Sequence, residues 1–106
     1  MALLIIEDKA RRSIRRAYIY GSMNFGIHTA KKFGARIEHC IRLIADQPHL
    51  GKQELLLVNR PYMYRSFVVL ENFKVIYRVD EIQNVVYIVD FWDVRQEPNR
   101  LVEEAK

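Results

Sequence analysis

The sequence has one cysteine, three prolines, four glycines and no long apolar run. Because Cys40 is alone, the chain cannot form an internal disulfide, and a lone thiol suits a reducing compartment. The apolar run from Ala2 to Ile6 is much shorter than a signal-peptide core, and no other stretch approaches the roughly 20 apolar residues that a membrane span needs. These absences predict a cytoplasmic protein without a membrane partner.

Ligands for a metal or a nucleotide are also missing. The three histidines are scattered, and together with one cysteine they form no set of zinc ligands at the usual spacing. Gly21 and Gly26 have the spacing of a P-loop, but Ile27 and His28 occupy the positions at which that motif needs Lys and Ser or Thr. The sequence therefore predicts neither a metal site nor a cofactor.

What the chain does have is a large apolar fraction and an excess of positive charge. Half of its 106 residues are hydrophobic, enough to bury one core without metals or disulfides, so we expect a single domain over residues 1–106. Seventeen Lys and Arg against thirteen Asp and Glu give a formal net charge of +4. This charge is compatible with an anionic partner such as RNA, DNA or an acidic protein.

The N-terminal half has the hydrophobic periodicity of one strand and two helices. The run 3–6, rich in aliphatic residues, predicts a short buried strand. From Asp8 to about Tyr20, apolar residues recur at helical spacing opposite a basic face. A second helix is clearer, because its apolar positions from Ala30 to Ile44 step by three and four residues.

The breaks in this pattern predict how the two helices are connected. Gly21–Asn24 is expected to separate them, with Ser22 or Asn24 capping the second helix. Pro48 and Gly51 are expected to end it. Two helices joined by a short connection pack as an antiparallel hairpin, which needs a sheet to cover its apolar side.

The C-terminal half predicts that sheet. After a stretch without clear periodicity, 52–61, three runs rich in Val, Ile, Phe and Tyr follow at 64–70, 73–79 and 85–92. Their short polar connections favour a three-stranded antiparallel meander, with the helical hairpin on one face and the N-terminal strand at an edge. The expected fold class is therefore α+β.

Alternation within the middle run predicts which side chains share a face of the sheet. One set is wholly apolar or aromatic, and we expect it to face the helices: Phe73, Val75, Tyr77 and Val79. The other set is partly charged, and we expect it to form an open face: Lys74, Ile76 and Arg78.

The predicted sheet carries a group of cations, namely Arg65, Lys74, Arg78 and Arg95. Cations held on an open sheet face can bind a phosphate and stabilise the extra negative charge of a phosphoryl-transfer transition state. A structural explanation is at least as good for Arg95, which can pair with Asp90 or Asp93 and fix the end of the last strand. Both interpretations stay open on composition alone.

Two other features are better explained by structure than by chemistry. Cys40 lies on the apolar stripe of the second helix, where a small buried thiol is common, so we expect it in the core and not as a nucleophile. The basic run from Lys9 to Arg16 can in principle bind phosphates, but a charged outer helix face is ordinary for a soluble domain.

Two short motifs connect this sequence with a known family. Phe73–Asp80 reads F-K-V-I-Y-R-V-D, and Asp93–Leu101 reads D-x-R-Q-x-P-x-x-L, with Pro98 inside it. With the order of strand, helical hairpin and antiparallel sheet, these motifs resemble the RelE/ParE superfamily of toxins from type II toxin-antitoxin modules. The resemblance extends from Leu3 to Leu101.

This resemblance implies a bacterial cytoplasmic toxin that arrests growth when it is free and uses no cofactor. Its implied partner is an antitoxin encoded beside it, acidic and partly disordered, which wraps an extended or helical segment over the grooves of the toxin. RelE-like members cut messenger RNA in the ribosomal A site without a metal. ParE-like members instead poison DNA gyrase and need no catalytic residues of their own.

The motifs carry over to this chain only in part. Lys74 and Arg95 match basic positions of the ribonuclease members, and Arg65 lies in a strand that often carries basic residues, so these three are the candidate catalytic residues. Leu101 stands where ribonuclease members commonly have a tyrosine, although Tyr62 or Tyr64 could take over proton transfer if its pKa were perturbed. We therefore expect a ParE-like gyrase inhibitor, with a RelE-like ribonuclease or a non-toxic nucleic-acid-binding module as the alternatives.

Overall fold

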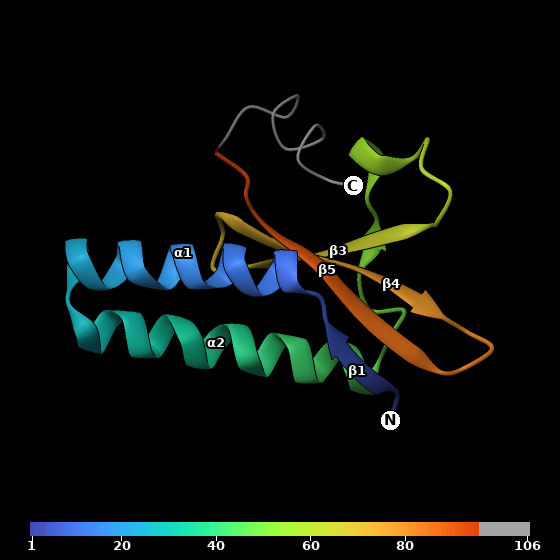
Figure 1. The fold of residues 1–106 in the computed structure, drawn as a ribbon, viewed down its shortest axis with the longest axis horizontal. Coiled ribbons are helices and arrows are strands. Elements are labelled where there is room, and N and C mark those ends of the chain that lie inside the picture. Colours follow the sequence, from blue (N-terminus) through green and yellow to red (C-terminus); the bar gives the residue numbers. More distant parts are fainter. Residues whose placement is uncertain (96–106) are drawn as a thin grey trace.

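The computed structural model describes residues 1–95, which form one sheet covered on one side by two helices (Figure 1). The elements in chain order are β1 (Leu3–Ile6), α1 (Asp8–Phe25), α2 (Ile27–Asp46), β2 (Lys52–Gln53), the 3-10 helix η1 (Leu55–Leu57), β3 (Tyr64–Val69), β4 (Phe73–Asp80) and β5 (Val85–Asp93). This order confirms the predicted α+β class, the helical hairpin and the three-stranded meander.

The sheet has five strands in the order β1-β5-β4-β3-β2. The meander β3-β4-β5 is antiparallel, whereas β1 pairs in parallel with β5 at one edge. The predicted edge position of β1 is therefore confirmed. Periodicity did not reveal β2, because it has only two residues, which pair with Arg65 and Ser66 of β3.

The break between the helices lies later than the sequence predicts. Helix α1 continues to Phe25, so the expected end near Tyr20 is wrong. Ser22 Oγ and Asn24 Nδ2 donate hydrogen bonds back to carbonyl oxygens within α1, at 2.9 and 2.8 Å, and neither caps α2. The chain turns at Gly26, whose φ of 91° is open to glycine but strained for other residues.

The main core lies between the helical hairpin and one face of the sheet. Figure 1 shows α1 and α2 side by side on that face. Val75 and Tyr77 are fully buried there, with Phe73 and Val79 packed against the same cluster, so the predicted helix-facing set is confirmed. Cys40 belongs to this core, as predicted, and burial raises the pKa of its thiol to about 11.

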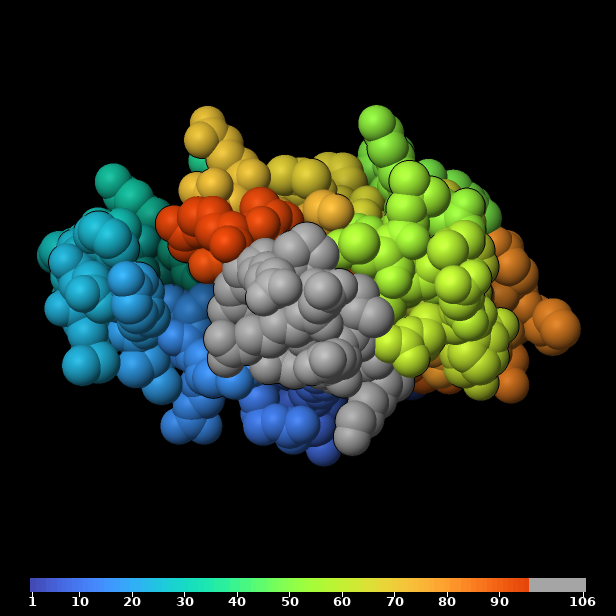
Figure 2. Space-filling model, turned by 90° about the horizontal axis from the view of Figure 1, so that it is seen from above, coloured from blue at the N-terminus to red at the C-terminus, as the bar shows by residue number. Residues whose placement is uncertain are grey.

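The middle of the other face of the sheet is covered, so the prediction of an open face is wrong there. Ile76 is fully buried, and it forms a second core with Leu57 of η1 and Trp92 of β5. Leu57 comes from the stretch without periodicity, which leaves the sheet edge at β2 and crosses this face before β3 begins. Figure 2 shows this segment, in green to yellow-green, at the opposite end of the molecule from the helical turn.

Candidate functional site

Arg65 lies on the helix-facing side of the sheet, because it is directly opposite Tyr77 in the β3-β4 register. Its Nη1 donates to the carbonyl oxygen of Gly51 at 2.8 Å, and its Nη2 is 3.1 Å from Nδ1 of His49. The expectation that Arg65 shares an open face with Lys74 is therefore wrong. In this structure Arg65 anchors the loop that follows α2.

Lys74 lies on the opposite face, and its ammonium is bound to an acid that the sequence did not single out. Lys74 Nζ donates to Oε1 of Glu54 at 2.7 Å, while Glu54 Oε2 accepts from the backbone N–H of Leu56 at 3.0 Å. Glu54 is only 3% exposed. An acidic residue directly before the run Leu55–Leu57 is typical of a helix N-cap, and this signal could have identified it.

Opposing influences act on the carboxyl of Glu54. Burial by itself raises its pKa, but the hydrogen bonds from Lys74 and from the Leu56 N–H outweigh burial and leave the pKa below its ordinary value of 4.5. Glu54 is therefore a carboxylate at neutral pH, and it holds η1 against the sheet through Lys74.

The Glu54–Lys74 pair predicts a pH dependence of stability. A lowered folded-state pKa contributes stability above the unfolded pKa, and this contribution is lost as the pH falls through the folded value. We expect the free energy of unfolding to decline on acidification below about pH 4.5 less steeply in Glu54→Gln than in the wild type. Urea denaturation between pH 3 and pH 7 measures both slopes, and equal slopes would contradict the prediction.

Arg95 pairs with Asp93, as the structural interpretation of this residue predicted. Its Nε and Nη2 donate to the two carboxylate oxygens of Asp93 at 2.9 and 2.8 Å, and its backbone N–H donates to the same side chain at 3.0 Å. The hydrogen bonds from Arg95 hold the pKa of Asp93 below its ordinary value. The guanidinium also lies 5.7 Å from the ring centroid of Phe73, a residue of the helix-facing set.

The three candidate catalytic residues thus do not converge. Arg65 and Lys74 are on opposite faces of the sheet, and Arg95 is beside Phe73 at the end of β5. Each is already bonded to a group of this chain. Pro98 and Leu101 lie outside the described residues, and no cluster of three His, Cys, Asp or Glu side chains that could hold a metal is found within residues 1–95.

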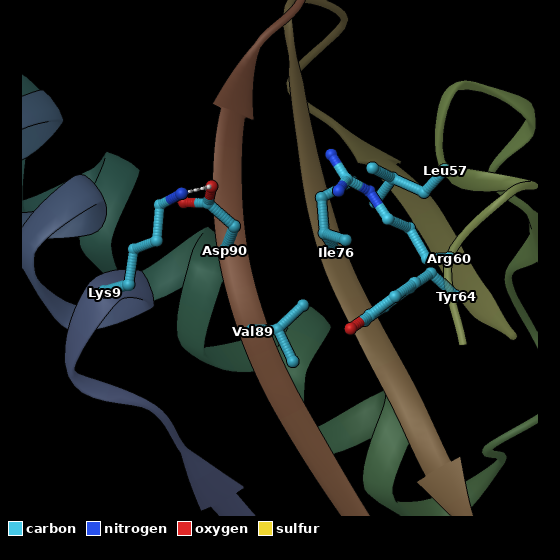
Figure 3. Close-up of a pocket in the computed structure, with 7 residues that line it drawn as sticks. All are labelled: Lys9, Leu57, Arg60, Tyr64, Ile76, Val89 and Asp90. Carbon is cyan, nitrogen blue, oxygen red and sulfur yellow. Dashed lines mark ion pairs between the residues drawn. The ribbon is translucent and has the colours of Figure 1, made fainter. Parts of the chain in front are cut away.

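A small pocket lies on the Lys74 face, between α1 and the segment that crosses the sheet. Figure 3 shows Lys9 and Asp90 on one side of it and Leu57, Arg60 and Tyr64 on the other. Lys9 Nζ is 3.5 Å from Oδ2 of Asp90. The enclosed space is about 20 Å³, which has room for one water and not for a nucleotide.

Comparison with known proteins defines the family. The family model described as the ParE toxin of the type II toxin-antitoxin system, parDE, matches residues 4–98. This chain belongs to the ParE toxin family. No match is found among curated proteins. Across residues 1–95 of this ParE-family toxin, no helix has the length and apolar content required to cross a membrane.

Solved structures show the same fold at low sequence identity. The chromosomal ParDE system of P. aeruginosa has a chain that is 18% identical, with a TM-score of 0.72 over 89% of this chain and 97% of that one. A mutant of the E. coli RelE toxin in the free state is 15% identical, with a TM-score of 0.61 over 99% and 95% of the two chains. The isolated E. coli RelE toxin is 11% identical, with a TM-score of 0.59 over 97% of each.

This ParE-family toxin has an apolar groove beside its edge strand. The groove has a volume of about 490 Å³ and is lined by side chains of β1, α1 and α2. Its lining is largely apolar and includes Leu4, Ile14 and Ile37. Three arginines also line it, and one of them, Arg42, is paired with Glu38 at 2.6 Å; the other two are Arg11 and Arg15. The adjacent outer edge of β1 has no strand beside it within residues 1–95, because β1 pairs only with β5.

Proposed function

We propose that this ParE-family toxin arrests growth by binding DNA gyrase and not by cutting messenger RNA. Separation of the three candidate catalytic residues is the observation that supports this proposal. A general acid and a general base must both reach the same reacting group, and cations must surround the developing charge. An inhibitor that acts only by binding its target needs no such cluster of groups around one reacting atom.

Two assays distinguish gyrase inhibition from RNA cleavage. We expect the purified protein to block supercoiling of a relaxed plasmid by gyrase, and we expect its induction in cells to leave messenger RNA 5′ ends unchanged. New 5′ ends inside translated codons, together with normal supercoiling, would overturn the proposal in favour of the RelE-like alternative. Normal supercoiling and unchanged RNA would favour the non-toxic binding module.

Arg95→Ala is a useful companion variant. The side chain of Arg95 is 60% exposed and bonds only to Asp93 among the described residues, so its loss should leave the fold intact. Gyrase inhibition should persist in this variant. A ribonuclease that used Arg95 for charge stabilisation would instead lose growth arrest while it kept its circular dichroism spectrum and its melting temperature.

The partner of a type II toxin is an antitoxin, and we propose that it occupies the groove between β1, α1 and α2. Its apolar lining suits the apolar side of a helix or an extended segment, and the lining arginines Arg11 and Arg15 suit acidic residues. The free edge of β1 gives an extended segment backbone groups to pair with. An acidic, partly disordered antitoxin in the bacterial cytoplasm fits both features.

A further inference from the structure

Arg78 lies between two tyrosine rings on the face of the sheet opposite the helices. Its Cζ is 4.3 Å from the ring centroid of Tyr62 and 4.0 Å from that of Tyr87. Tyr64 and Tyr87 are its directly paired neighbours on β3 and β5. Tyr62 also contacts Tyr64 edge to face, with centroids 6.4 Å apart. The guanidinium is therefore held by two aromatic rings, one from the segment before β3 and one from β5.

These two ring contacts leave the N–H groups of the guanidinium unused. Within residues 1–95, no hydrogen bond or ion pair is made by the Arg78 side chain, whereas Arg65, Lys74 and Arg95 are all bonded to groups of this chain. An arginine whose rotamer is already held loses little conformational entropy when it binds, and its planar fork matches a carboxylate with two parallel hydrogen bonds. Arg78 is thus oriented to bind an anion that residues 1–95 do not supply.

We propose that Arg78, held between Tyr62 and Tyr87, binds an Asp or Glu side chain of an acidic antitoxin segment that carries apolar residues next to it. This inference rests on the proposed antitoxin partner and adds a second contact, on the other side of the sheet from the groove. Tyr and Arg are the residue types that most often dominate the binding energy of protein interfaces.

The surroundings of Arg78 favour a carboxylate in a protein segment over the phosphates of a nucleic acid. A nucleic acid strand needs a series of available cations, but on this face Lys9 is paired with Asp90 and Lys74 with Glu54. Asp80, two residues after Arg78 on the same strand, would repel a continuous phosphate backbone more than a single carboxylate flanked by apolar residues.

Exposed apolar side chains lie in the segments that adjoin this site. Tyr62 is 56% exposed and Met63, beside it before β3, is 48% exposed. Ile82, in the turn that follows β4, is 97% exposed. Apolar groups around one charged contact are what a protein partner needs to exclude water from that contact.

The test is a titration of this toxin with the small acidic protein encoded beside it, by isothermal calorimetry. Arg78→Ala should weaken binding at least about 30-fold, the lower end of what truncation of one partner of a buried charge pair costs. Arg78→Lys keeps the charge but lacks the planar guanidinium that can bond both carboxylate oxygens. Its affinity should therefore stay close to that of Arg78→Ala. Arg36→Ala, which removes one positive charge from the exposed surface of α2, should leave the affinity unchanged.

Charge reversal identifies the carboxylate. Arg78→Glu should abolish binding, and changing one acidic residue of the partner to Arg should restore it. Wild-type affinity in both Arg78→Ala and Arg78→Glu would overturn the Arg78 contact and leave the antitoxin function standing. Absence of binding by the wild type would overturn both.

A nucleic acid ligand is tested separately by the fluorescence anisotropy of labelled single-stranded dT20 and rU20. We expect no binding that depends on Arg78. Binding that is lost in Arg78→Ala and kept in Arg36→Ala would overturn the protein partner in favour of a nucleic acid. Unchanged melting temperatures in all variants establish that the differences come from the site and not from the fold.

Discussion

Replacing Asp90 with alanine is expected to lower the free energy of unfolding by about 3–5 kcal/mol, the usual cost of removing one partner of a buried charge pair. Asp90 is 5% exposed, and its carboxylate accepts hydrogen bonds from Ser13 Oγ at 2.8 Å and from Trp92 Nε1 at 3.0 Å. It also lies 3.5 Å from the ammonium of Lys9, a nitrogen that is buried without a hydrogen-bond partner. Without Asp90, the Ser13 hydroxyl and the Trp92 indole N–H lose their acceptor, and the Lys9 ammonium loses its ion-pair partner.

Chemical denaturation at neutral pH measures this loss, and Asp46→Ala is the matched control. Asp46 is exposed at the end of α2, so its replacement should change stability by less than about 0.5 kcal/mol. If both variants lost the same small amount, the Asp90 network would not hold α1 against β5. The near-ultraviolet circular dichroism of Trp92, which reports its packing, should change only in Asp90→Ala.

Gly51→Ala is expected to destabilise the protein by about 1–3 kcal/mol, the usual cost of overpacking a filled site. A Cβ at Gly51 would lie 2.6 Å from the carbonyl oxygen of Ser66 and 2.7 Å from the hydroxyl oxygen of Tyr77. Gly51 N donates to that same hydroxyl at 2.7 Å, and the hydroxyl donates to the Pro48 carbonyl at 2.9 Å. The buried tyrosine cannot move without loss of these two bonds, and the Ser66 oxygen belongs to the backbone of the sheet.

Gly21→Ala is the matched control, and its expected effect has the opposite sign. A Cβ at Gly21 would meet nothing within 4 Å, and the residue lies inside α1. Replacing an unconstrained helical glycine with alanine should raise stability by about 0.5–1 kcal/mol. The melting temperatures of both variants test this prediction. A lower melting temperature in Gly21→Ala or a higher one in Gly51→Ala would contradict the roles given to the two glycines.

Most of the fold could be predicted from the sequence because its elements depend on local patterns. A period of 3.6 residues defines α2 and a period of two defines β4, and short polar connections force neighbouring strands to be antiparallel. The errors came where local pattern is ambiguous. Gly21 and Gly26 both look like a helix end, and only Gly26 takes the positive φ that a sharp turn needs.

The contacts of the candidate site residues were predicted less well than the fold. Periodicity shows which face of a strand a side chain is on, but it does not show which residues contact that side chain. Lys74 was placed correctly on the face opposite the helices, but its acid, Glu54, lies 20 residues earlier in a stretch without periodicity. Arg65 was placed on the wrong side, because the sequence does not say how the register of β3 against β4 is set.

The sequence by itself determined the fold class, the helical hairpin, the meander and the family resemblance, since all of these depend on residue types at short spacing. Only the tertiary structure decided which cations remain available. It pairs Lys74, Arg65 and Arg95 with groups of this chain and covers Ile76 with Leu57, while it stacks Arg78 between two tyrosines. The physical reason is that ion pairing and stacking act over a few ångströms between residues that the chain brings together only when it folds.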